Sequence, residues 1–135
     1  MIINETLRLY PPVPTINRVT LTGVKLGGSP GLDLPAGTQL SAALIGLHHD
    51  TEIWEGDASE FNPMRFSEPR KHLASHFPFG LGPRTCVAQN LATTELKVIL
   101  ALILQHYSFT VSPTYVHAPV MSVTSTSVWR SDSLQ

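Results

Sequence analysis

The stretch FPFGLGPRTC, from Phe77 to Cys86, decides how the rest of the sequence is interpreted. It ends on the single cysteine of the 135-residue chain. Gly80 and Gly82 can adopt positive φ or let a flat partner approach the backbone, and Arg84 carries a planar charge that suits carboxylates. A lone cysteine excludes an internal disulfide and a cysteine-rich zinc site. It leaves a buried structural thiol, a nucleophile or a single thiolate ligand.

The residues around the cysteine favour a thiolate. Residues 85–106 are predicted to form one long helix, so Cys86 lies where free N–H groups and the helix dipole stabilise a negative charge. A thiolate beside the aromatic Phe79 and the carboxylate-binding Arg84 suits a metal cofactor that carries carboxylates. The competing nucleophile requires a histidine base. Neither of the histidines close in sequence, at positions 72 and 76, belongs to a cysteine-hydrolase pattern.

Composition and charge limit the classes of function. Hydrophobic residues make up 42% of the chain and charged residues 14%, so the sequence can build a core. The net charge is −1 and no basic run interleaves with aromatics, which argues against nucleic acid as a partner. The start of the chain lacks the features of a signal peptide. The longest apolar run, residues 98–104, is shorter than the ~20 residues of a membrane span, so we expect a soluble or peripheral chain.

Two helices are predicted, one at each side of the glycine-rich stretch. The first covers residues 1–9 and is ended by the prolines of YPPVP at residues 10–14. The second, at residues 85–106, is apolar on every face in its later half. Such a helix should be buried in something larger than itself, and we expect poor stability of the isolated chain.

Short strands are predicted between and after the helices. Residues 32–34 and 38–46 should pair as a hairpin around the turn Pro35-Ala36-Gly37. Residues 107–128 suggest further hairpin strands. The expected fold class is α+β, mainly helical with small β hairpins.

Three motifs in order along the chain carry a family resemblance. The stretch at residues 77–86 fits the pattern F-x-x-G-x-R-x-C, which resembles the haem-thiolate loop of the cytochrome P450 family. ETLR at residues 5–8 is similar to that family's Glu-x-x-Arg helix. Pro63 and Arg65 of FNPMRF look like its Pro-x-Arg element. Ala88 departs from the pattern, because the family usually has glycine two residues after the cysteine.

The resemblance implies which residues form the site. The cofactor would be haem b (iron protoporphyrin IX), near which His72 and His76 are expected to be solvated loop histidines rather than contacts. The implied residues are Cys86 as axial iron ligand, Phe79, Gly82, Arg84 and Arg18 as haem-binding residues, Glu5, Arg8 and Arg65 as a buried structural triad, and Val13, Pro14, Thr15 and Ile16 as substrate contacts.

The resemblance also implies a domain organisation. Residues 1–121 would be the C-terminal portion of a cytochrome P450 domain, since members of the family are several times longer. Residues 122–135 would be a divergent tail rich in serine and threonine.

The implied activity is that of a haem-thiolate monooxygenase. It would insert one oxygen atom from O2 into a small lipophilic, steroid- or terpenoid-like substrate, with electrons from NADPH through a reductase. LHHDTEIW looks similar to the plant microsomal branch, which implies the cytosolic face of the endoplasmic reticulum membrane for full-length members, although these 135 residues bear no anchor. One alternative is a non-catalytic product of a truncated gene that at most binds haem. A member that rearranges peroxides without O2 ranks last, because such members usually carry an insertion in the cysteine loop.

Overall fold

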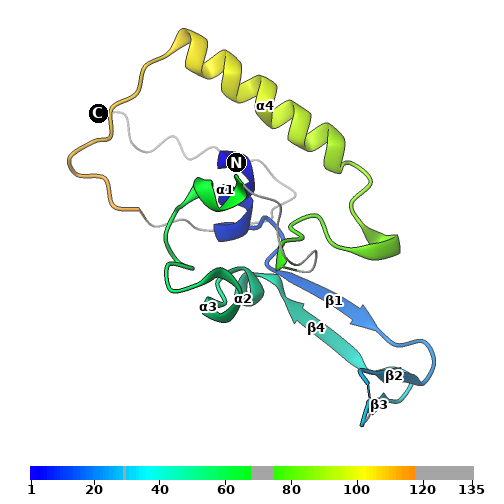
Figure 1. Ribbon diagram of the computed structural model, residues 1–135. Coiled ribbons are helices and arrows are strands. Elements are labelled where there is room, and N and C mark those ends of the chain that lie inside the picture. The colour runs from blue at the N-terminus through cyan, green and yellow to red at the C-terminus, as the bar shows by residue number, and fades with distance from the viewer. Residues whose placement is uncertain (29, 68–74, 118–135) are drawn as a thin grey trace.

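The computed structural model describes residues 1–28, 30–67 and 75–117 (Figure 1). Helices hold more residues than strands, and the strands form two small antiparallel pairs, so the predicted α+β class is confirmed. The elements in chain order are α1 (Ile2–Leu9), β1 (Thr15–Val19), β2 (Val24–Leu26), β3 (Leu32–Leu34), β4 (Gln39–Ala43), α2 (Leu44–His48), α3 (Thr51–Trp54), the 3-10 turns η1 (Pro63–Phe66) and η3 (Gly82–Arg84), and α4 (Gln89–His106).

Helix α1 forms where the sequence predicts it. Its polar residues Glu5 and Arg8 are buried together with Leu7 and Leu9, so the buried face of this helix is half charged. The helix ends at Leu9, because the prolines that follow Tyr10 cannot continue the turn. The N–H of the capping residue Tyr10 donates to the carbonyl of Thr6. A helix with a buried carboxylate and guanidinium needs partners for both, and these come from segments far along the chain.

The strands form one long ribbon that projects from the body (Figure 1). In β1 and β4, Thr15 lies opposite Ala43 and Val19 opposite Gln39. Farther out, β2 pairs with β3. The prediction that residues 32–34 pair with 38–46 is therefore wrong.

Thr20 explains this pairing. Its hydroxyl donates to the carbonyl of Pro35 at 2.7 Å, and the N–H of Thr38 donates to that hydroxyl at 3.0 Å. The N–H of Gly37 donates to the carbonyl of Thr20 at 2.7 Å. The turn at residues 35–37 thus folds against the end of β1 and sends the chain into β4 beside β1.

Strand β4 is shorter than the predicted 38–46. It ends at Ala43, and α2 begins at Leu44, which is 1% exposed. The N–H of Ile45 donates to the carbonyl of Pro14 at 3.2 Å. Burial of Leu44 against the start of β1 therefore converts the last predicted strand residues into a helical turn.

The core is small and lies where α1, α2, α3 and η1 meet. Helix α1 packs against both α2 and η1. The buried hydrophobic residues of this core are Leu7, Leu9, Leu44, Trp54 and Ala58.

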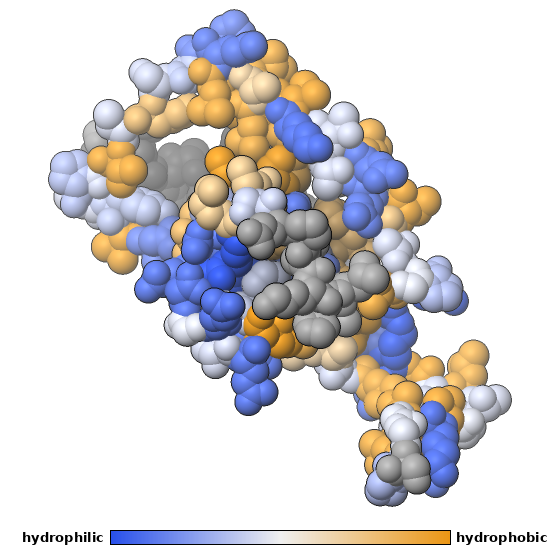
Figure 2. Space-filling view, in the orientation of Figure 1, coloured by the Kyte–Doolittle hydropathy of each residue, from blue (hydrophilic) through white to orange (hydrophobic). Residues whose placement is uncertain are grey.

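Helix α4 stands apart from this core (Figure 1). It begins at Gln89 rather than at the predicted residue 85, and none of its residues is buried. Leu91 and Leu104 are each 69% exposed, and hydrophobic residues gather along the helix (Figure 2). The sequence predicts that this apolar helix is buried, but within the described residues nothing covers it. Within the same residues, no helix combines the length and hydropathy that a membrane span requires.

The residues after α4 differ from the prediction of hairpin strands. Residues 107–117 contain a turn and no strand. The rest of the predicted hairpin, residues 118–128, and the whole predicted tail, residues 122–135, lie outside the described residues.

Candidate functional site

The loop that carries the cysteine is folded back on itself by main-chain hydrogen bonds. The N–H of Cys86 donates to the carbonyl of Phe79 at 2.8 Å, and the N–H of Gly80 donates to the carbonyl of Phe77 at 2.9 Å. Gly80 and Gly82 have φ of 80° and 79°, a region that favours glycine. The closed loop leaves the Cys86 thiol exposed three residues before α4, whereas the predicted helix at residues 85–106 would have placed it in the first turn.

A cavity of about 480 Å³ brings most of the predicted site residues together. It lies between this loop and the start of β1. The predicted residues that line it are Cys86, Phe79, Arg84, Arg18, Val13, Thr15 and Ile16. Of the residues predicted to contact haem or substrate, Gly82 and Pro14 do not line it.

Sequence reasoning missed some of the lining residues. Leu44, at the start of α2, faces the cavity beside Pro78 and Gly80 of the loop. A strand was predicted at Leu44, so nothing in the pattern marked it as a site residue. Its near-complete burial gives the cavity an apolar wall.

The residues fit a planar metal cofactor with two carboxylates. A single thiol supplies one soft ligand, which is the donor that suits iron in a haem-thiolate site. Arg18 and Arg84 reach the same cavity from β1 and from η3, and guanidinium groups bind carboxylates in a bidentate manner. Phe79 and Ile16 add aromatic and apolar surface against which a flat ring can pack. The donor set therefore matches haem and its propionates.

Behind the loop, Glu5 accepts hydrogen bonds from two arginines. Arg8 donates to both of its carboxylate oxygens, at 2.8 and 2.9 Å, and Arg65 donates to Oε1 at 3.2 Å. The N–H of Asn62 donates to Oε1 at 2.8 Å. The three predicted triad residues thus form one cluster, in which Glu5 and Arg8 are fully buried and Arg65 is 12% exposed.

The electrostatics of this cluster lower the pKa of two carboxyl groups. Burial alone raises the pKa of Glu5, but the hydrogen bonds from Arg8 and from the N–H of Asn62, with the charge of Arg8, outweigh it and hold the pKa below 4.5. The pKa of Asp57 lies below 3.8 because Asn62 and then Arg65 donate hydrogen bonds to it. Both carboxylates are therefore charged at neutral pH, as an ion cluster requires.

His76 is not a solvated loop histidine. Its Nε2 lies 3.1 Å from the carbonyl oxygen of Asn4 on α1, and its ring stacks on that of His48 with centroids 5.4 Å apart. The expectation of solvation is wrong because the loop before the cysteine packs on the core. His72 lies outside the described residues.

Comparison with known proteins supplies the family. The sequence model of the family described as Cytochrome P450 matches residues 1–131 of the chain. The chain belongs to the cytochrome P450 family. Members of this family hold haem through a cysteine thiolate.

Several plant cytochromes P450 are similar to the chain. Cytochrome P450 CYP749A22 of Panax ginseng is 50% identical over 129 residues, which are 92% of this chain and 24% of that protein. Cytochrome P450 734A1 of Arabidopsis thaliana is 48% identical over 125 residues, 90% of this chain and 24% of that protein. The 11-oxo-beta-amyrin 30-oxidase of Glycyrrhiza uralensis is 48% identical, with 92% of this chain and 24% of that protein covered. The chain spans about a quarter of the length of the curated relatives it matches.

Solved structures agree on the fold. A zebra fish cytochrome P450 with progesterone is 35% identical, with a TM-score of 0.72 over 84% of this chain and 25% of that one. A zebra fish cytochrome P450 with abiraterone is 36% identical, with a TM-score of 0.66 over 76% of this chain and 24% of that one. The described residues therefore adopt part of the cytochrome P450 fold.

Proposed function

We propose that the chain is the C-terminal part of a haem-thiolate monooxygenase. The observation that carries this proposal is the common cavity of Cys86, Arg18 and Arg84, on a loop with the F-x-x-G-x-R-x-C pattern. Cys86 would supply the thiolate ligand of the iron, and the two arginines would bind the propionates of haem b. Phe79 would pack beside the thiolate, and Gly82 would allow the positive φ that the loop needs at this position. Haem held by a thiolate supplies the activation of O2 when it is bound.

The reaction would place one atom of O2 in a C–H bond of a small lipophilic substrate, while the other atom leaves as water. An NADPH-dependent reductase would supply the electrons. A steroid- or terpenoid-like substrate is supported by two similar proteins, a beta-amyrin oxidase of a plant and a zebra fish enzyme whose structure contains progesterone. Val13, Thr15 and Ile16 would contact the substrate, because they line the cavity from the β1 side. Pro14 remains a prediction of the sequence alone.

Helix α4 supports the proposal that the chain is one part of a larger domain. Its leucines and isoleucines are exposed on every side within the described residues, whereas domains of this size bury such residues. The rest of a cytochrome P450 domain would cover them. Residues 1–121 would then be the C-terminal portion of that domain and residues 122–135 a divergent tail. A full-length protein would act at the cytosolic face of the endoplasmic reticulum membrane.

The same exposed helix is consistent with a second candidate function. If no further segment accompanies the chain, it would be a non-catalytic product that at most binds haem. The two candidates share the haem site. They differ in whether a further segment of protein packs on α4.

Haem binding to the 135-residue chain tests the shared part. The purified chain is mixed with haem, reduced and exposed to CO, and the Soret band is recorded. A red-shifted band of the thiolate type is expected, and Cys86→Ser should abolish it while leaving the described fold intact. A parent chain whose band matches that of Cys86→Ser would overturn the assignment of Cys86.

Co-expression tests the larger-domain part. The chain is produced together with the N-terminal three quarters of the Panax ginseng relative. We expect the two pieces to co-purify with bound haem, and charged substitutions at Ile99 and Leu102 of α4 to prevent this. Thr94→Ser, at an exposed polar position of the same helix, serves as the control. Failure of the parent chain to co-purify would leave the non-catalytic candidate.

A further inference from the structure

His48 connects the charged cluster to the loop that carries the cysteine. It is the last residue of α2 and is fully buried. Its carbonyl oxygen accepts a hydrogen bond from Arg8 Nη1 at 2.6 Å. Its ring Nε2 accepts a hydrogen bond from the N–H of Phe77 at 3.4 Å. One residue therefore contacts the cluster through its main chain and the first residue of the loop through its side chain.

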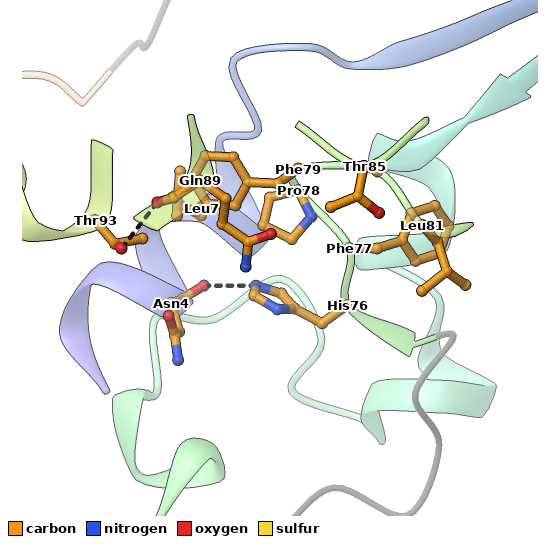
Figure 3. A pocket seen from close by; sticks show the side chains of 11 residues that line it. Asn4, Leu7, His76, Phe77, Pro78, Phe79, Leu81, Thr85, Gln89 and Thr93 are labelled. Atoms are coloured by element: carbon orange, nitrogen blue, oxygen red, sulfur yellow. Dashed lines mark hydrogen bonds between the residues drawn. The ribbon is translucent and has the colours of Figure 1, made fainter. Parts of the chain in front are cut away.

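Ring contacts hold the same junction. The rings of His48 and His76 are stacked at 5.4 Å, and the ring of Phe77 meets His48 edge-on at 6.0 Å. His76 is bonded in turn to the carbonyl of Asn4 on α1, as Figure 3 shows. The start of the loop is thus fixed against both α1 and α2.

The hydrogen bond from Phe77 assigns the role of His48 Nε2. A main-chain N–H only donates, so Nε2 is the acceptor of this bond. Beyond Phe77, two main-chain hydrogen bonds fix the rest of the loop relative to this residue. The carbonyl of Phe77 accepts from Gly80, and the carbonyl of Phe79 accepts from the N–H of Cys86. The place of His48 therefore sets the place of the thiol.

We propose that His48 is a positioning residue for Cys86, a role that rests on the proposed function of Cys86 as the haem ligand. It acts through the Phe77 N–H and does not touch the cavity of the thiol. The cluster of Glu5, Arg8 and Arg65 would then fix the geometry of the iron ligand through this residue, in addition to holding the fold.

Three substitutions separate the acceptor from simple burial. His48→Gln places an amide where Nε2 lies, His48→Asn is polar but too short to reach Phe77, and His48→Phe keeps the ring without an acceptor. The matched control is His49→Phe, since His49 Nε2 contacts the carbonyl of Leu9 at 3.1 Å rather than the loop. All variants are made in the 135-residue chain.

The first measurement is amide hydrogen exchange of residues 77–86 in the haem-free chain. His48→Phe and His48→Asn should each raise exchange at Phe77 by about 2- to 10-fold, which is the usual effect of one lost hydrogen bond. His48→Gln and His49→Phe should leave exchange at this residue unchanged. If Asn and Gln behave alike, the acceptor has no such role and the proposal is overturned, and this comparison stands even where His48→Phe does not fold.

The second measurement is the ferrous–CO spectrum of the haem-loaded chain. The thiolate-type band should lose intensity in His48→Asn and return in His48→Gln. Equal bands in the two variants would contradict a positioning role. A parent chain without a thiolate band would remove the proposed function of Cys86, whereas the exchange pattern would still decide the link between His48 and Phe77.

Discussion

The Cζ atom of Arg8 lies 5.0 Å from the centroid of the Trp54 ring, although the two residues are far apart in the sequence. The same guanidinium donates two hydrogen bonds to Glu5 and three to the carbonyl oxygens of His48, Ala58 and Glu60. All five of its N–H groups are therefore satisfied in a fully buried site. This arrangement ties α1 to segments that begin 40 residues later, and it makes Arg8 the centre of the small core.

Arg8→Lys should destabilise the chain strongly. An ammonium group has three donors and no planar fork, so it cannot serve Glu5 and the three carbonyls at once. Each buried carbonyl left without its donor costs about 1–3 kcal/mol in the free energy of unfolding. Urea unfolding followed by tryptophan fluorescence measures this cost. Lys25→Gln is the control, because Lys25 and Asp33 form an exposed pair at 3.8 Å. A cost no larger than that of the control would disprove the central role of Arg8.

Stability should fall in acid because of Glu5 and Asp57. Their folded pKa values lie below 4.5 and 3.8, so the unfolded chain binds protons first. The stabilisation is fully present above these ordinary values and is lost as the pH falls through them towards the folded pKa values. Urea midpoints at pH 7, 5, 4 and 3 should therefore drop mainly below about pH 4.5.

Glu5→Gln tests that assignment. It should lower stability at pH 7 and make the remaining pH dependence shallower, because the group that titrates is gone. Asp33→Asn removes an exposed carboxylate. In this variant the slope of stability against pH should equal that of the parent chain. An unchanged slope in Glu5→Gln would mean that other groups cause the acid effect.

Arg18→Gln and Arg84→Gln should weaken haem binding. A hydrogen bond to a charged group contributes about 1.5–3 kcal/mol, so each loss should raise the Kd of haem by about 10-fold or more. Titration of haem into the chain, followed at the Soret band, gives these values. Lys25→Gln again serves as the control, since it lies on the outer ribbon. Parent-like affinity in both arginine variants would argue against the propionate contacts.

Gly82→Ala should loosen the cysteine loop. Gly82 has φ of 79°, and nothing lies within 4 Å of an added Cβ, so the cost is conformational alone. Left-handed backbone costs about 1–2 kcal/mol for a residue with a Cβ. Exchange of the Cys86 N–H should speed up by about 5- to 30-fold.

Gly56→Ala provides the matched control for that variant. Its added Cβ also meets nothing within 4 Å, and its φ is not positive. It should leave exchange at Cys86 unchanged. Equal effects of the two alanines would show that the backbone angle at Gly82 is not what holds the loop.

The sequence alone identified the residues whose neighbours lie close along the chain. The spacing of Phe79, Gly82, Arg84 and Cys86 is local, so a pattern could reveal it. Helix α1 and its proline stop are local in the same way. The ion cluster was predicted because separate motifs of the chain resemble those of a family. The hydrogen bond from Arg65 to Glu5 shows that these motifs meet in the folded chain.

The errors fall where distant contacts outweigh local preference. Residues 44–46 have the character of a strand, but burial of Leu44 and the bond from Ile45 to Pro14 make them helical. Likewise, Thr20 directs the turn at residues 35–37 towards β1, which a pattern within residues 32–46 does not contain.

The short motifs identify the family from the sequence, because their chemistry depends on local spacing. The family resemblance already implied that Arg18 binds haem, and the fold brings this residue to the cavity of Cys86. The link from the ion cluster to the loop through His48 appears only in the folded chain. Both arrangements join segments tens of residues apart, which hydrophobic burial and hydrogen bonding bring together only when the chain folds.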